Sequence, residues 1–173
     1  MNQIEAKSIV EKTVMDNKHG FSLMESYTKE YSTCFVFYYQ NDAYIKSGRF
    51  QDMSLGQGPV IVCKKTGKVF ETGSAYSTEH YISAFEACGD PHGVPTSKIV
   101  ISSGSEGENA VKAIRCLKAA SGCGLSEAKS KIDEVLKGNS VVVELTSVDK
   151  VTSTLSTLKL HGFECVQLWS NQC

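Results

Sequence analysis

The sequence lacks the features of membrane, secreted and highly charged proteins. Its 173 residues contain no apolar run near the ~20 residues that a membrane-spanning helix needs, so we expect no membrane association. The opening residues, MNQIEAKSIVEK, have no basic start followed by an apolar stretch, and we therefore expect no secretory signal. Eighteen basic and nineteen acidic residues leave a net charge of −1, which argues against nucleic acid as a partner held by overall charge.

Cysteine pairs at metal-binding or redox spacing are also missing. Seven cysteines are an odd number at wide and irregular intervals, which favours free thiols in a reducing cytoplasm. No Cys-x-x-Cys motif occurs and the four histidines are scattered, so we expect no metal ion and no other cofactor. We also expect no catalytic residues and no enzyme. The open alternative, a cysteine-dependent enzyme, predicts one unusually reactive thiol.

Proline is scarce, and two of the three prolines fall in one short stretch. Pro91 and Pro95 lie with two glycines in CGDPHGVPTS, residues 88–97. Because proline removes a backbone donor and glycine lowers the cost of irregular dihedrals, neither helix nor strand should persist there. The sequence therefore predicts a linker over 89–97 between two small α+β domains, 1–88 and 98–173.

The predicted first domain mixes helices with aromatic strands. A helix is expected over 3–16, and STCFVFYYQ, residues 32–40, reads as one buried strand because it is rich in β-branched and aromatic residues. Residues 59–72 predict a hairpin around Thr66-Gly67. Ser77 is placed to cap the short helix that follows, with its apolar residues on one side.

The predicted second domain has the order β-α-α-β-α-β. Its strands are expected at 99–101, at 141–143 as the central strand, and at 165–169. Its helices are expected to end at glycines, two of them starting at Ser126 and Ser147. This order buries one face of a sheet under the helices.

The stretch AVKAIRCLKAASGCGLSEAKSKIDEV, residues 110–135, resembles the C-terminal domain of the bacterial ribosomal large-subunit stalk protein. The shared pattern is a helix, a glycine-x-glycine-leucine bend and a second amphipathic helix, within about residues 98–170. The resemblance implies a basic helical hairpin that docks translation GTPases, with Arg115, Lys118 and Lys129 at the basic positions. The chain lacks the stalk protein's dimerisation helices, so the resemblance extends to fold and docking face and not to a ribosomal role.

The first half resembles the immunity protein 35 family of bacterial polymorphic-toxin systems, over about residues 20–87. The stretches CFVFYYQNDAYIKSGRFQD (34–52) and GQGPVIVCKKTGKVFETGSAYSTEHYI (56–82) carry the resemblance. The shared pattern is an aromatic strand, a Gly-x-Gly-Pro entry, a Lys-x-Gly hairpin and a short helix. The family implies a cytoplasmic antidote that binds a cognate toxin, and some relatives are described as chaperone-like.

Two groups of residues are the predicted partner contacts. Residues 110–132 hold five basic side chains and one acidic side chain, and Lys112 lies one helical turn from Arg115, so a basic docking face is expected there. The first half offers aromatic and charged residues in irregular segments, and Tyr and Arg commonly anchor interfaces. The full set is Tyr44, Arg49, Phe50, Asp52, Tyr76, Glu79, Lys112, Arg115, Lys118 and Lys129.

These patterns predict a non-enzymatic immunity protein that blocks a toxin domain by steric occlusion. The alternative is a chaperone-like or translation-factor-binding adaptor that uses the basic helical hairpin. The sequence leaves open the identity of the toxin, the domain that makes the contacts and the oligomeric state.

Overall fold

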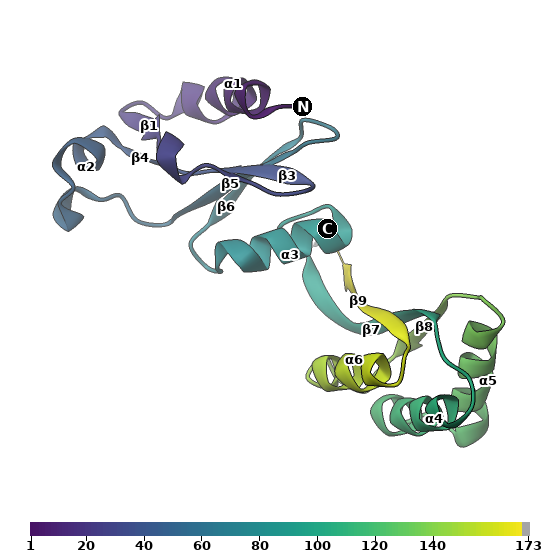
Figure 1. The fold of residues 1–173 in the computed structure, drawn as a ribbon. Helices are drawn as coiled ribbons and strands as arrows, with labels where there is room; N and C mark the ends of the chain where they lie inside the picture. The colour runs from purple at the N-terminus through teal and green to yellow at the C-terminus, as the bar shows by residue number, and fades with distance from the viewer. Residues whose placement is uncertain (171–173) are drawn as a thin grey trace. The chain divides into compact units, whose positions relative to one another are not determined.

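The chain folds as two compact units, Met1–Gly93 (unit 1) and Val94–Cys173 (unit 2), in a computed structural model that describes residues 1–170 (Figure 1). Each unit combines helices with small antiparallel sheets, so the predicted α+β class is confirmed. The terminal Cys173, one of the seven cysteines, lies outside the described residues.

Unit 1 contains a four-stranded sheet of order β2-β3-β5-β6 and a separate pair of strands, β1 and β4. Its elements, in chain order, are α1 (Gln3–Thr13), η1 (Met15–Asn17), β1 (Phe21–Leu23), η2 (Glu25–Tyr27), β2 (Lys29–Glu30), β3 (Cys34–Phe37), β4 (Tyr39–Asn41), α2 (Asp42–Ser47), η3 (Phe50–Asp52), β5 (Gln57–Cys63), β6 (Val69–Gly73) and α3 (Thr78–Cys88).

The four-stranded sheet lies between α1 and α3 (Figure 1). Alternate residues of β3 point to opposite faces, as in any strand. Phe35 and Phe37 pack toward α1, whereas Cys34 and Val36 pack toward α3. All four are buried, which explains why the sequence of this strand is continuously apolar instead of alternating.

The predicted single strand over 32–40 is wrong in one respect, because the structure divides it at Tyr38. The first part, β3, pairs with β2 and β5, and the second part, β4, pairs with β1 in the other sheet. Tyr38 donates or accepts a 2.8 Å hydrogen bond with the Thr78 hydroxyl at the start of α3. Local composition is equally favourable on both sides of Tyr38, so only the tertiary partners reveal the break.

The predicted hairpin and helix cap in unit 1 are confirmed. Strands β5 and β6 pair antiparallel, and Gly67 takes a positive φ in the turn that joins them. The Ser77 side chain accepts a hydrogen bond from the backbone N–H of His80 at the start of α3. The apolar side of that helix buries Tyr81 and Phe85 against the sheet.

Unit 2 has the predicted order β-α-α-β-α-β. Its elements are β7 (Val94–Ser103), α4 (Glu108–Ser121), α5 (Leu125–Leu136), β8 (Val141–Glu144), α6 (Lys150–Leu160) and β9 (Glu164–Ser170). The sheet order is β8-β7-β9, so β7 is the central strand and the prediction that 141–143 is central is wrong. The longer β7 can pair along both sides, whereas β8 spans only four residues.

The expectation that no strand persists in residues 89–97 is also wrong, because β7 already begins at Val94. Pro95 lies opposite Trp169 of β9, whereas pairing with β8 starts only at Lys98. At Pro95 the strand therefore has a paired neighbour on one side only. Proline, which has no backbone N–H to donate, is tolerated at such edge positions. The register of β7 against β9 shifts between Pro95 and Ile99, as at a β-bulge.

The predicted starts of two helices in unit 2, Ser126 and Ser147, differ from the observed ones, and the predicted cap at Ser147 is wrong. Helix α5 starts one residue before Ser126, with Gly124 at the cap position, and α6 starts after Asp149. Neither helix has a side-chain cap hydrogen bond. The backbone carbonyl of Ser147 instead accepts a hydrogen bond from the N–H of Lys150, and this bond closes a turn before α6.

Candidate functional site

Exposed apolar side chains gather in one short stretch of unit 1, here called the α2–η3 segment and defined as residues 41–55. Phe50 is 75% exposed and Leu55 is 71% exposed. Ile45 and Met53 are also exposed, at 44% and 37%. Four exposed large apolar side chains within one short stretch of chain make this segment a candidate interaction site.

Side-chain amides hold the two ends of the α2–η3 segment together. The carbonyl oxygen of the Asn41 side chain caps α2 by accepting from the Tyr44 N–H at 2.8 Å, and its amide donates to the Asp52 carbonyl at 2.7 Å. Gln40 is buried, and it donates to the Ser54 carbonyl and accepts from the Ser54 N–H. These bonds connect the start of the segment to its end.

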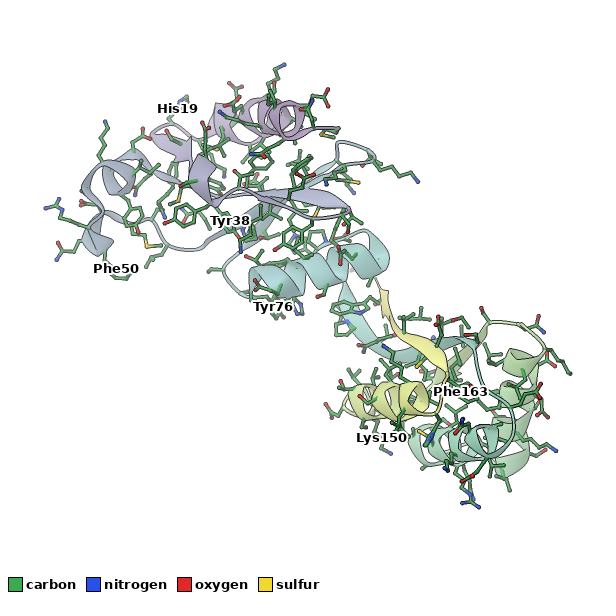
Figure 2. The ribbon with its side chains drawn as sticks, viewed as in Figure 1. His19, Tyr38, Phe50, Tyr76, Lys150 and Phe163 are labelled. Atoms are coloured by element: carbon green, nitrogen blue, oxygen red, sulfur yellow. The ribbon has the colours of Figure 1, made fainter. Side chains whose placement is uncertain are left out.

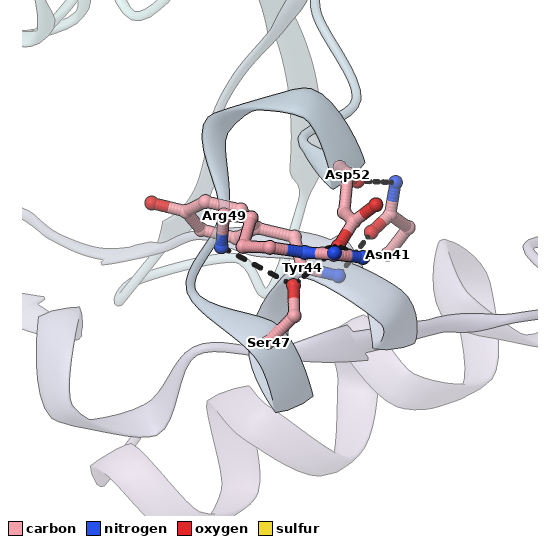
Figure 3. Close-up of polar contacts among 5 residues, drawn as sticks. All are labelled: Asn41, Tyr44, Ser47, Arg49 and Asp52. Carbon is pink, nitrogen blue, oxygen red and sulfur yellow. Dashed lines mark hydrogen bonds and ion pairs between the residues drawn. The ribbon is translucent and has the colours of Figure 1, made fainter.

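A second set of bonds centres on the Asp52 carboxylate, as Figure 3 shows. Its Oδ2 accepts from the Ser47 hydroxyl at 2.5 Å and from Arg49 Nε at 2.9 Å. The Ser47 oxygen also accepts from the Arg49 N–H at 3.2 Å. Gly48, between them, takes the left-handed conformation that ends α2. Arg49 and Asp52 therefore hold the turn between α2 and η3 in one shape.

The α2–η3 segment thus combines exposed apolar side chains with a backbone that is fixed in advance. Phe50 projects from the end of unit 1 into solvent (Figure 2). Binding a partner orders flexible groups at a cost, and a segment already held by internal bonds incurs less of that cost. Aromatic side chains that enter a pocket on the partner supply much of the binding energy of typical interfaces. A segment with these properties is suited to binding the surface of another protein.

The four residues predicted as contacts in this segment differ from one another in exposure and in pairing. Phe50 is exposed and Tyr44 is half-buried, whereas Arg49 and Asp52 are paired with each other. Sequence reasoning missed the exposed Ile45, Met53 and Leu55. No pattern distinguishes them from core residues, since apolar side chains in a globular protein are most often buried.

Tyr76 and Glu79 lie at the start of α3, apart in the chain from the α2–η3 segment. The Tyr76 ring is 60% exposed and stacks on His80, with 4.3 Å between ring centroids. The Glu79 carboxylate accepts hydrogen bonds from its own N–H and from Ser77, and these bonds hold its pKa below the ordinary value. Glu79 therefore has a local role in stabilising the first turn of α3.

A basic groove of about 580 Å³ lies in unit 2 between α4 and α6. Two of the predicted basic residues line it, together with cationic, hydroxyl and small side chains from both helices. The lining residues are Lys112, Arg115, Cys116, Ala119, Ala120, Lys150, Ser153, Thr154, Thr157 and His161. This set is here called the α4–α6 groove.

The cations of the α4–α6 groove are only partly neutralised. Lys112 pairs with Glu108 at 2.8 Å, and this ammonium, with a smaller effect of His161, holds the pKa of Glu108 below its ordinary value. Within residues 1–170, no carboxylate lies within ion-pair distance of Arg115 or Lys150. Unpaired cations at a concave surface attract acidic groups and speed encounter with an acidic partner.

The predicted basic face is therefore divided by the tertiary structure. Lys112 and Arg115 line the α4–α6 groove, whereas Lys118 and Lys129 are exposed outside its lining. Sequence reasoning missed Lys150 and His161. Both lie near the ends of α6, about 35 residues or more after Arg115 in the chain, and only the packing of α6 beside α4 brings them to the groove.

Residues 1–170 contain no group of three or more His, Cys, Asp or Glu side chains placed to hold a metal ion. None of the helices in the same range has the length and apolar character that crossing a bilayer requires.

Comparison with known proteins finds no match among protein-family models, curated proteins or solved structures. The two resemblances inferred from the sequence therefore stay predictions.

Proposed function

We propose that this chain is a non-enzymatic immunity protein that acts in the cytoplasm by binding a cognate toxin and neutralising it. The observation that carries the proposal is the α2–η3 segment, whose exposed apolar side chains stand on an internally bonded backbone. The resemblance of residues 34–82 to the immunity protein 35 family supplies the class of partner. The six cysteines in the described residues are all free thiols, which suits a reducing compartment.

The proposed mechanism is steric occlusion of the toxin's active or target-binding surface. A stable interface of ordinary size covers about 800 Å² on each partner, which is enough to close the entrance of an enzyme's active site. Phe50 and Leu55 would provide the apolar centre, and Arg49 and Asp52 would lie at its polar edge. Such a mechanism needs a fitting surface and no catalytic group on the antidote.

Co-expression with the candidate toxin tests this function. The probe is the product of the open reading frame immediately upstream of the gene. We expect that product to arrest growth when expressed alone, and we expect this chain to restore growth and to co-purify with it. Restored growth together with a stable complex is the expected result.

Two outcomes would contradict the proposal. One is continued toxicity in cells that contain soluble antidote in excess. The other is rescue without any complex between the purified proteins, because occlusion requires contact. An unrelated toxin of the same size serves as the specificity control and should remain toxic.

The α4–α6 groove favours a second candidate function, an adaptor that docks on an acidic protein surface. Arg115 and Lys150 face this groove without carboxylate partners. The resemblance of residues 110–135 to the ribosomal stalk domain names a translation elongation GTPase as the partner to test. In this case unit 2 would make the contact, and the α2–η3 segment would not be needed.

Charge reversal separates this function from the first. We expect Arg115→Glu and Lys150→Glu each to weaken binding of an elongation GTPase at least about tenfold, or about 1.4 kcal/mol, because each adds like-charge repulsion. Lys159→Glu makes the same charge change on α6, outside the groove lining, and is the matched control. Binding measured by biolayer interferometry that responds equally to all three variants, or no binding at all, would reject the groove as the docking site.

A further inference from the structure

Two cysteines face each other across adjacent strands of unit 1. Cys34 of β3 is the direct register partner of Cys63 of β5. The N–H of Lys64 donates to the carbonyl of Thr33 at 3.0 Å, so the hydrogen-bonded pair is the neighbouring one. The two cysteines therefore occupy a non-hydrogen-bonded position of the antiparallel ladder, where opposing side chains come closest.

This position satisfies the geometric requirement of a disulfide. At a non-hydrogen-bonded pair the Cα atoms lie about 4.5 Å apart. Disulfides join Cα atoms that are about 4.4–6.8 Å apart. Both side chains lie on the same face of the sheet, in the cluster that packs against α3. Both cysteines are free thiols in the structure, and closing the bond would require no change of strand register.

The two thiols differ in access and in acidity. Cys63 is partly exposed at the end of β5, whereas Cys34 is fully buried. Burial raises the pKa of Cys63, but hydrogen bonds from Thr66 and from the backbone of Thr66 and Lys65, with the Lys65 charge, outweigh it and leave the pKa below its ordinary value. Burial raises the pKa of Cys34, and the Glu86 charge adds to this effect.

We propose that Cys34 and Cys63 form an oxidation site at which a hydroperoxide converts the two thiols to a disulfide. The Cys63 thiolate attacks the peroxide, the O–O bond breaks, and Cys63 becomes a sulfenic acid as water or an alcohol leaves. The Cys34 sulfur then attacks the Cys63 sulfur, the S–O bond breaks, and the hydroxyl leaves as water with the proton of the Cys34 thiol. Two thiols lose two hydrogen atoms in total, and the peroxide is reduced. Two molecules of a small thiol would then reduce the disulfide by exchange, becoming a disulfide themselves and restoring both cysteine thiols.

Cys34 precedes the α2–η3 segment in the chain and Cys63 follows it. Residues 35–62, which include the whole segment, connect Cys34 to Cys63, so the disulfide would enclose the segment in a covalent loop. Such a loop restricts the unfolded chain and raises the stability of the folded state. Oxidation would thus protect unit 1 from unfolding, an effect that does not depend on the proposed toxin binding.

Peptide mapping of the full chain after treatment with hydrogen peroxide tests the proposal. Trypsin cuts after Lys29, Lys46, Arg49 and Lys64, so the disulfide would join peptides 30–46 and 50–64. We expect this linked pair in the non-reduced digest and its loss on addition of a reductant. We also expect the oxidised chain to melt at a higher temperature than the reduced chain. Absence of the linked pair after oxidation of Cys63 would overturn the proposal.

The order of the two steps is tested with single variants and dimedone, which traps sulfenic acids. In Cys34→Ser the sulfenic acid has no resolving thiol, so we expect dimedone on Cys63. In Cys63→Ser we expect no comparable label on Cys34. Cys88→Ser changes a partly exposed thiol of the same unit and should leave the linked peptides intact. Loss of the linked pair in that control, or equal labelling in the first two variants, would contradict the assignment.

Discussion

Phe50→Ala is expected to weaken binding to the cognate partner by about 30-fold or more while leaving the fold unchanged. Truncation of a central aromatic contact commonly costs about 2 kcal/mol or more of binding free energy, which corresponds to this loss. The Phe50 side chain is 75% exposed, so removing it leaves no cavity in the core. Substitutions at such positions change the free energy of unfolding by less than about 0.5 kcal/mol.

The measurement is a titration of the purified partner, by calorimetry or interferometry, with growth rescue as the cellular readout. Ile4→Ala is the matched control, because Ile4 is 81% exposed on α1 of the same unit and lies outside the α2–η3 segment. Unchanged affinity in Phe50→Ala, with the complex intact, would show that another surface makes the contact. Equal loss in both variants would likewise contradict a role specific to this segment.

Phe35→Ala, in contrast, is expected to destabilise the fold. We expect it to lower the free energy of unfolding of unit 1 by about 3–5 kcal/mol. The Phe35 ring is 1% exposed and packs between the sheet and α1, where Val62 lies directly opposite in the register. The ammonium of Lys64 also lies 4.7 Å from the ring centroid. Truncation removes these contacts and leaves a cavity that the sheet can only partly close.

The positions of the aromatic residues allow this loss to be assigned to one unit. All seven tyrosines belong to unit 1, whereas the single tryptophan, Trp169, belongs to unit 2. Denaturant unfolding followed by the near-ultraviolet dichroism of tyrosine should shift in Phe35→Ala, and tryptophan fluorescence should shift far less. A tyrosine transition equal to that of the unsubstituted chain would mean that Phe35 is not in the core of unit 1.

Features set by neighbouring residues were predictable from the sequence. The Ser77 cap depends on a side chain and an N–H three residues apart. The turn at Gly67 depends on the freedom of glycine to take a positive φ. The order of helices and strands in unit 2 follows from apolar periodicity and glycine stops, because both signals repeat within a few residues. The mixed α+β class follows from the same local signals.

Features set by residues far apart in the chain were not predictable. Local composition gave no reason to divide 32–40 at Tyr38 or to place β7 at the centre of its sheet, because strand partners are chosen by long-range packing. The α4–α6 groove needs Lys150 beside Arg115, and the thiol pair needs Cys63 opposite Cys34. The sequence by itself determined which elements form, since propensity and capping act locally. Only the tertiary structure decided which side chains meet and which apolar ones stay exposed, because burial depends on the whole fold.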